Sequence, residues 1–106
     1  MKQLQGRHMK KNRNSRTLEC AARWLAERDE LWVDGYEASA RTIFENMEFK
    51  NGNLYKNYKK GMGYMQFVMR MRTHPCFKIK RGNPNMYSCT MEKYNRYWAD
   101  KGSFHL

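Results

Sequence analysis

The sequence has no long apolar run and few cysteines, prolines and glycines. No stretch of about 18 apolar residues occurs, which excludes a membrane-spanning helix, and the first residues lack the apolar core of a secretory signal. The three cysteines, Cys20, Cys76 and Cys89, are an odd number without a disulfide-framework spacing, which is typical of a reducing compartment. These absences predict a soluble, cytoplasmic protein of one domain within its 106 residues.

Motifs of catalysis and metal binding are missing as well. Nothing in the sequence resembles a phosphate-binding glycine loop, a nucleophile elbow or a pair of metal-binding dyads. His74, Cys76 and Cys89 could meet near one end of a hairpin, but a zinc site would need a fourth ligand, and no CxxC unit is present. A Cys76 nucleophile with His74 as its base has no evident geometry. We therefore expect no enzymatic activity, no metal and no cofactor, and we expect the thiols in the core.

Charge is distributed unevenly along a chain whose formal net charge is +11. Residues 1–16 hold six cations and no acid, whereas residues 17–48 hold eight acids and three arginines. Residues 49–81 hold nine cations and again no acid. Because a basic stretch without acids repels itself, its usual explanation is a polyanionic partner, above all nucleic acid. A merely solvated basic face is the alternative. A membrane surface is disfavoured because no long amphipathic helix carries the cations.

Two amphipathic helices are predicted in the acidic part of the chain. The first covers residues 17–32, with Trp32 on its apolar face and Ser15 or Thr17 as its N-cap. The second is short and follows a cap at Ser39. A turn lies between them, and a short extended stretch can follow that turn.

A loop, a third helix and a hairpin are predicted in the basic part. Residues 48–61 have no sustained period and contain Asn-Gly-Asn, which indicates a long, basic loop with one irregular turn at most. The third helix covers residues 62–73, with Phe67 and Met71 on its core face, and Pro75 forces its end.

The register of the hairpin follows from placing apolar residues opposite one another. Pairing Lys80 with Met86 places Ile79 opposite Tyr87 and leaves a five-residue loop, which is an ordinary length. The aromatic C-terminal stretch after the hairpin predicts a short terminal helix packed on the body.

This order of elements over residues 17–91 resembles the winged-helix variety of helix-turn-helix domain. The segment RMRTHPCF, from Arg70 to Phe77, is similar to the helix-to-wing junction of such domains, where a basic helix ends at His-Pro ahead of a buried aromatic. We accordingly expect an α+β, winged-helix-like single domain over residues 17–106, preceded by a flexible basic arm, residues 1–16. The long segment before the third helix and the aromatic C-terminus depart from the usual pattern.

The resemblance implies a third helix in the major groove, with the wing and the arm on the DNA backbone. The expected function is therefore that of a small bacterial or phage regulator or accessory factor that binds duplex DNA at the nucleoid. In this interpretation Gln66 would address adenine and Arg70 guanine. The nucleic-acid-binding candidates are Lys10, Lys11, Arg13, Lys56, Lys59, Lys60, Gln66, Arg70, Arg72, Lys78, Lys80 and Arg81.

Met62, Met65 and Met69 lie opposite the core face of the third helix, and three interpretations of them stay open. They could contact thymine methyl groups, bind a protein partner through their adaptable side chains, or be covered by the aromatic C-terminal segment. A protein-interaction or inhibitor module is thus the main alternative function. RNA binding is the third, because tyrosines alternate with lysines in the loop, a pattern typical of base-stacking platforms as well as of ordinary core packing.

Overall fold

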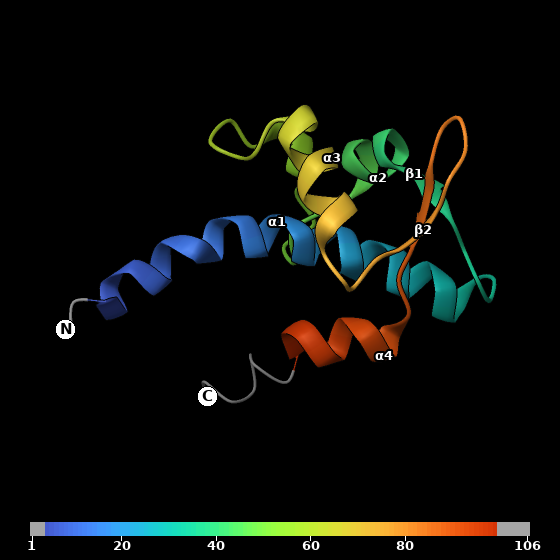
Figure 1. Cartoon of the computed structure of the whole chain (residues 1–106), viewed down its shortest axis with the longest axis horizontal. Helices are drawn as coiled ribbons and strands as arrows, with labels where there is room; N and C mark the ends of the chain where they lie inside the picture. The colour runs from blue at the N-terminus through green and yellow to red at the C-terminus, as the bar shows by residue number, and fades with distance from the viewer. Residues whose placement is uncertain (1–3, 100–106) are drawn as a thin grey trace.

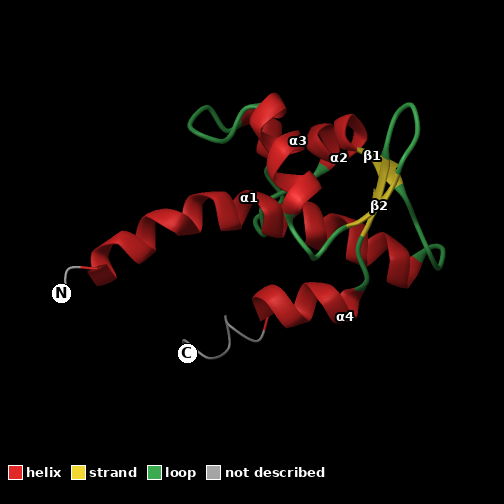
Figure 2. Cartoon of the chain, viewed as in Figure 1, coloured by secondary structure: helices red, strands yellow, loops and turns green. Residues whose placement is uncertain are grey.

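The computed structural model describes the backbone of residues 4–99 and the side chains of residues 16–98. Within this part, four α-helices and a three-stranded antiparallel sheet form an α+β fold (Figure 1; Figure 2). In chain order the elements are α1 (Leu4–Leu31), β1 (Ala38–Ser39), α2 (Ala40–Asn46), the 3-10 turn η1 (Tyr55–Asn57), α3 (Tyr64–Thr73), β2 (Lys78–Lys80), β3 (Met86–Ser88), α4 (Met91–Tyr94) and the π-helical turn η2 (Asn95–Ala99). Among the described residues, no helix combines the length and apolarity that crossing a bilayer requires.

The long helix α1 runs behind α3 in the view of Figure 1 and supplies much of the core. Leu18 and Leu25 lie on its buried face, as the periodicity predicts. The predicted N-caps are wrong, because the helix begins at Leu4 and Thr17 lies in its middle. Thr17 is only 1% exposed, and its hydroxyl oxygen lies 2.7 Å from that of Tyr55. A residue that looked like a helix start is thus part of the core.

The sheet consists of the predicted hairpin with a third strand at its edge. Ile79 pairs with Tyr87 and Lys80 pairs with Met86, so the predicted register is confirmed. The strand order is β1-β3-β2, and Ala38 of β1 pairs with Tyr87. The short extended stretch that was expected after the first turn thus becomes the edge strand β1, although at Ala38–Ser39 and not at Tyr36 and Glu37. A strand of two residues is too short for the alternation of polar and apolar residues to show.

Helices α2 and α3 pack on α1 and on each other. Ser39 caps α2 as predicted, since its Oγ accepts a hydrogen bond from the Thr42 N–H at 3.2 Å. Helix α3 begins at Tyr64, two residues later than predicted. Phe67 and Met71 are fully buried, which confirms the predicted core face. That face fixes which side of α3 is left for solvent.

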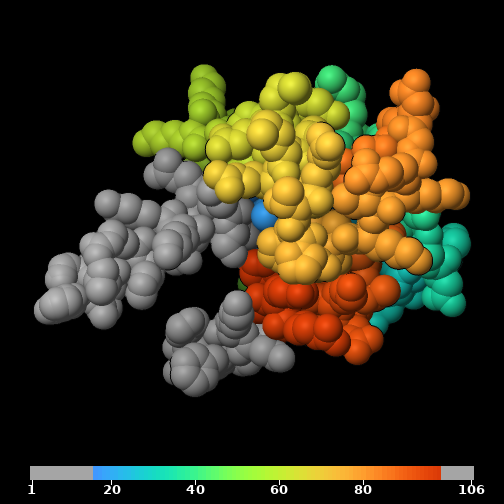
Figure 3. All heavy atoms as spheres, viewed as in Figure 1, coloured from blue at the N-terminus to red at the C-terminus, as the bar shows by residue number. Residues whose placement is uncertain are grey.

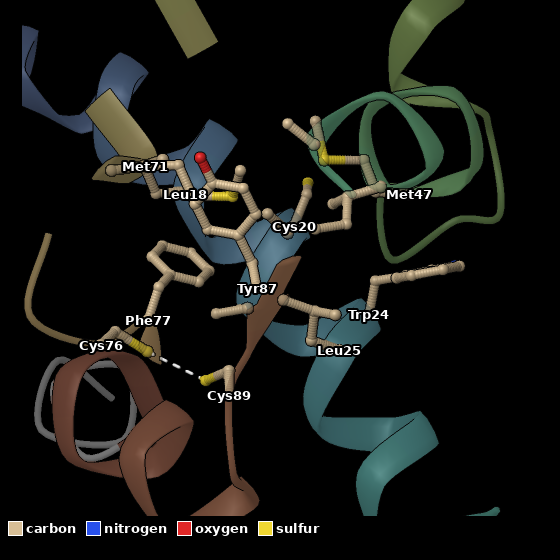
Figure 4. Close-up of a cluster of buried hydrophobic side chains, with 14 of the residues drawn as sticks. Leu18, Cys20, Trp24, Leu25, Met47, Met71, Cys76, Phe77, Tyr87 and Cys89 are labelled. Atoms are coloured by element: carbon tan, nitrogen blue, oxygen red, sulfur yellow. Dashed lines mark hydrogen bonds between the residues drawn. The ribbon is translucent and has the colours of Figure 1, made fainter. Parts of the chain in front are cut away.

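Figure 4 shows the core that these elements enclose. The ring of Tyr87 lies at its centre and is almost fully buried. The thiols of Cys76 and Cys89 lie just before β2 and just after β3, with their Sγ atoms 3.0 Å apart. Cys20 is buried too, so the expectation of core thiols is confirmed.

The predicted terminal helix is present as α4 followed by η2, and α4 packs against α1 (Figure 1). The Tyr94 hydroxyl donates a hydrogen bond to Glu19 Oε2 of α1 at 3.0 Å. The ring of Trp98 stacks on that of His74 with centroids 5.2 Å apart. The aromatic segment therefore covers α1 and the end of α3.

Candidate nucleic-acid interface

The outward side of α3 carries six exposed side chains in one continuous arc. At about 100° per residue, this arc spans a little less than half of the helix circumference. In order around the helix, the exposed residues are Arg72, Met65, Met69, Thr73, Gln66 and Arg70. None of them is acidic, so the polar side of this amphipathic helix is basic.

The hairpin adds its cations beside α3. Lys78 and Lys80 are exposed on β2, while Ile79 between them is half-buried. Arg81 follows as the first residue of the hairpin loop and is also exposed. Lys80 Nζ lies 4.0 Å from Glu37 Oε1, but an exposed pair at that distance contributes about 0 to 1 kcal/mol. The ion pair therefore leaves the lysine free to bind another anion.

An open groove joins the helix to the hairpin. Figure 3 shows α3 (yellow) and the hairpin (orange) adjacent on one face of the molecule. The groove between them has a volume of about 330 Å³. We call it the cationic groove, and its lining residues are Met69, Arg72, Thr73, Ile79, Arg81 and Asn85. Helix and hairpin thus each contribute an apolar side chain and an arginine to one groove.

Four cations of this surface form no ion pair with an acid among the described residues. Among the described residues, the ion pairs within 4.0 Å include none formed by Arg70, Arg72, Lys78 or Arg81. Unpaired cations that share one face create a positive potential that attracts polyanions. The cations that cluster in the sequence therefore also share one surface of the folded protein.

The loop before α3 is anchored, and its lysines point to solvent. Lys56, Lys59 and Lys60 are all exposed. Tyr55 is buried, and its hydroxyl accepts a hydrogen bond from the backbone N–H of Met62 at 2.6 Å. Core packing is therefore the correct interpretation of this tyrosine.

The methionine prediction is wrong for one residue of three. Met62 precedes α3, is 7% exposed and packs in the core beside Tyr55, so it cannot bind a partner. Met65 and Met69 are 73% and 65% exposed. The described part of the aromatic C-terminal segment does not cover them, because it packs on α1 and His74 instead.

The segment predicted as an N-terminal arm falls within α1 from Leu4 onward. The side chains of Lys10, Lys11 and Arg13 lie outside the described residues. Their contacts with nucleic acid stay predictions.

His74, Cys76 and Cys89 lie together at the base of the hairpin. His74 Nδ1 accepts the backbone N–H of Cys76 at 3.0 Å, so this nitrogen does not face the thiol as a base. Within residues 16–98, no three His, Cys, Asp or Glu side chains are grouped to hold a metal ion. The cluster belongs to the core at the base of the hairpin.

One exposed feature was missed from the sequence. Trp32 was predicted on the apolar face of the first helix, but it is 67% exposed. Helix α1 ends at Leu31, and the turn that follows carries Trp32 away from the core. The adjacent Asp34-Gly35 turn signal was the indication that the helical period ends here.

Comparison with known proteins adds no relative from which a function could be transferred. No family model matches the chain, and no curated protein or solved structure is similar to it. The functional interpretation accordingly depends on the geometry and charge of the chain itself.

Proposed function

We propose that this protein is a small winged-helix-like factor that binds duplex DNA without catalysing a reaction. The observation that carries the proposal is the basic surface shared by α3 and the β2–β3 hairpin. Two separate elements place exposed cations on one face, and the cationic groove connects them. A lone basic helix or loop is often only a solvated face, whereas two converging elements match the shape of a nucleic-acid partner.

In the proposed complex, α3 enters the major groove. Gln66 and Arg70 lie side by side on the exposed arc, where Gln can pair with adenine and Arg with guanine. Lys78, Lys80 and Arg81 contact phosphates from the hairpin, as a wing does. The element order α1, β1, α2, α3, β2, β3 supports this arrangement, because it resembles that of winged-helix domains.

Several exposed acids lie outside α3 and the hairpin. Glu27, Glu30 and Asp34 are exposed at the C-terminal end of α1 and in the turn after it. A protein with separated charges is oriented by the field of a polyanion as it approaches, which accelerates productive encounters. The segregation of charge thus supports a single DNA-facing side.

A protein partner is the second candidate, and the exposure of Met65 and Met69 favours it. Adjacent exposed methionines are unusual on a surface that binds only phosphates, and their flexible side chains suit protein contacts. Such a module would use the same face of α3 to bind and inhibit another protein.

Charge reversal tests the proposal against its alternatives. Arg70→Glu and Arg72→Glu are compared with Arg96→Glu, a matched change on the far helical segment, in gel shifts with duplex DNA, single-stranded DNA and structured RNA. We expect duplex binding by the unmodified protein and the Arg96 variant, and its loss in the other two. Equal binding of all three probes would contradict recognition of duplex DNA and indicate general nucleic-acid binding instead. Unchanged duplex binding after reversal at Arg70 and Arg72 would contradict the proposal.

A further inference from the structure

Three large apolar side chains, consecutive in the sequence, are exposed at the end of α1 and in the turn that follows. Leu31, Trp32 and Val33 are 74%, 67% and 59% exposed. Single exposed apolar residues are normal on a protein surface, but a contiguous cluster with a tryptophan is typical of a protein contact. We call residues 30–34 the acidic knob, because Glu30 and Asp34 flank the cluster.

The acidic knob is held in place although it is exposed. The Arg28 guanidinium lies over the Trp32 ring, 5.4 Å from its centroid, and the Tyr36 ring meets Trp32 edge-on at 6.2 Å. Asp29 Oδ1 accepts the N–H of Gly35 at 2.6 Å, and Gly35 has a φ of +79°, which glycine adopts without strain. A surface fixed before binding loses little conformational entropy when a partner docks.

Charge around the acidic knob is opposite to that of the rest of the protein. Residues 27–37 hold five acids and a single arginine, on a chain of net charge +11. Such a surface suits a partner that offers an apolar recess bordered by cations.

The chain carries such a recess itself. The cationic groove has Met69 and Ile79 as apolar lining and Arg72 and Arg81 as cations, with a volume of about 330 Å³. That volume is at the lower end of the range of about 300 to 1,000 Å³ for ligand pockets and admits one large side chain. Trp32 is too exposed to occupy the groove of its own copy.

We propose that the acidic knob of one copy docks into the cationic groove of a second copy. Trp32 enters between α3 and the hairpin, and Glu30 and Asp34 pair with Arg72 and Arg81. The contact is heterologous, because it joins two different surfaces of the same chain, so a bound pair still offers one free knob and one free groove. Assembly therefore proceeds head to tail with rising concentration.

Self-association goes beyond the proposed function and is measured without DNA. Because the groove lies within the proposed DNA-binding surface, duplex DNA and a second copy compete for it. If DNA binding fails while self-association persists, only the proposed function is lost.

Sedimentation velocity of complementary variants tests the contact. Trp32→Ser removes the knob, and Arg72→Glu with Arg81→Glu reverses the charge of the groove, with circular dichroism to confirm the fold of each. The unmodified protein should form species larger than a dimer as its concentration rises. Each variant alone should stay monomeric, whereas an equimolar mixture should form a one-to-one dimer and stop there, since only one intact knob and one intact groove meet.

Three results would overturn the proposal. The first is a monomeric unmodified protein over the whole concentration series at low salt. The second is association of the Trp32→Ser variant equal to that of the unmodified protein. The third is a mixture of the two variants that stays monomeric while the unmodified protein associates, because an intact knob and an intact groove would then fail to bind each other.

Discussion

The hydroxyl oxygens of Thr17 and Tyr55 lie 2.7 Å apart inside the core and join α1 to the loop that precedes α3. The same Tyr55 oxygen accepts the backbone N–H of Met62 at 2.6 Å. One buried hydroxyl thus positions the chain just before α3 begins. The orientation of the proposed DNA-binding helix depends on this anchor.

Replacing Tyr55 by Phe should lower the free energy of unfolding by about 1 to 3 kcal/mol. The ring stays, but the buried N–H of Met62 loses its acceptor, and an unsatisfied buried donor costs about that much. Urea denaturation measures the loss, with Tyr58→Phe as the control because Tyr58 is exposed. A change in the control equal to that of Tyr55→Phe would show that the buried hydrogen bonds are not the cause.

Gly61→Ala should destabilise the protein by about 1 to 3 kcal/mol through overpacking at the same anchor. A Cβ at Gly61 would lie 2.6 Å from the Tyr55 hydroxyl oxygen and 2.8 Å from its Cζ. Gly63→Ala is the matched control, because no atom lies within 4 Å of a Cβ there. Thermal unfolding of the two variants should separate them, and equal melting temperatures would contradict the close approach at Gly61.

Stability should fall as the pH rises from about 10 to about 12. Burial, the charge of Glu19 and the hydrogen bond to it raise the pKa of Tyr94 from 10 to about 12. Between these values the unfolded chain loses the tyrosine proton while the folded protein keeps it, so ionisation favours unfolding. Urea denaturation across this range should show a shallower decline for Tyr94→Phe. An identical decline in both proteins would contradict the shifted pKa.

The three thiols should resist alkylation in the folded protein. Cys20, Cys76 and Cys89 are all buried, which keeps the reagent from them. Burial also raises the pKa of Cys20 to about 11, and the hydrogen bond between the other two thiols raises the pKa of Cys89 and lowers that of Cys76. Because burial excludes the reagent from all three, iodoacetamide near neutral pH should label none of them until urea is added. Mass spectrometry counts the labels. Rapid labelling of any thiol without urea would place it outside the core.

The hairpin could be predicted because its apolar residues specify one register. Ile79 must face Tyr87 if both are to be buried, and a shift of one residue would turn the apolar face of one strand to solvent. The core face of α3 was predictable for the same reason, since Phe67 and Met71 follow the helical period. Once the buried faces of these two elements were predicted, the cations on their opposite faces could be predicted to be exposed.

Other features depend on contacts between distant parts of the chain. The hydrogen-bond partner of Thr17 lies 38 positions away in the chain. No local pattern in the sequence distinguishes this buried threonine from one that caps a helix. Met62 has the correct spacing for the outer face of α3, but the helix starts after it. The cationic groove needs α3 and the hairpin to converge, which periodicity does not show.

The dependence of duplex DNA affinity on salt tests the central claim most directly. If the cations of α3 and the hairpin neutralise about six phosphates, a plot of log affinity against log salt concentration should have a slope of about −5. Arg70→Ala should reduce the magnitude of that slope by about 1, whereas Arg96→Ala should leave it unchanged. A slope near zero, or a slope insensitive to Arg70, would contradict the account.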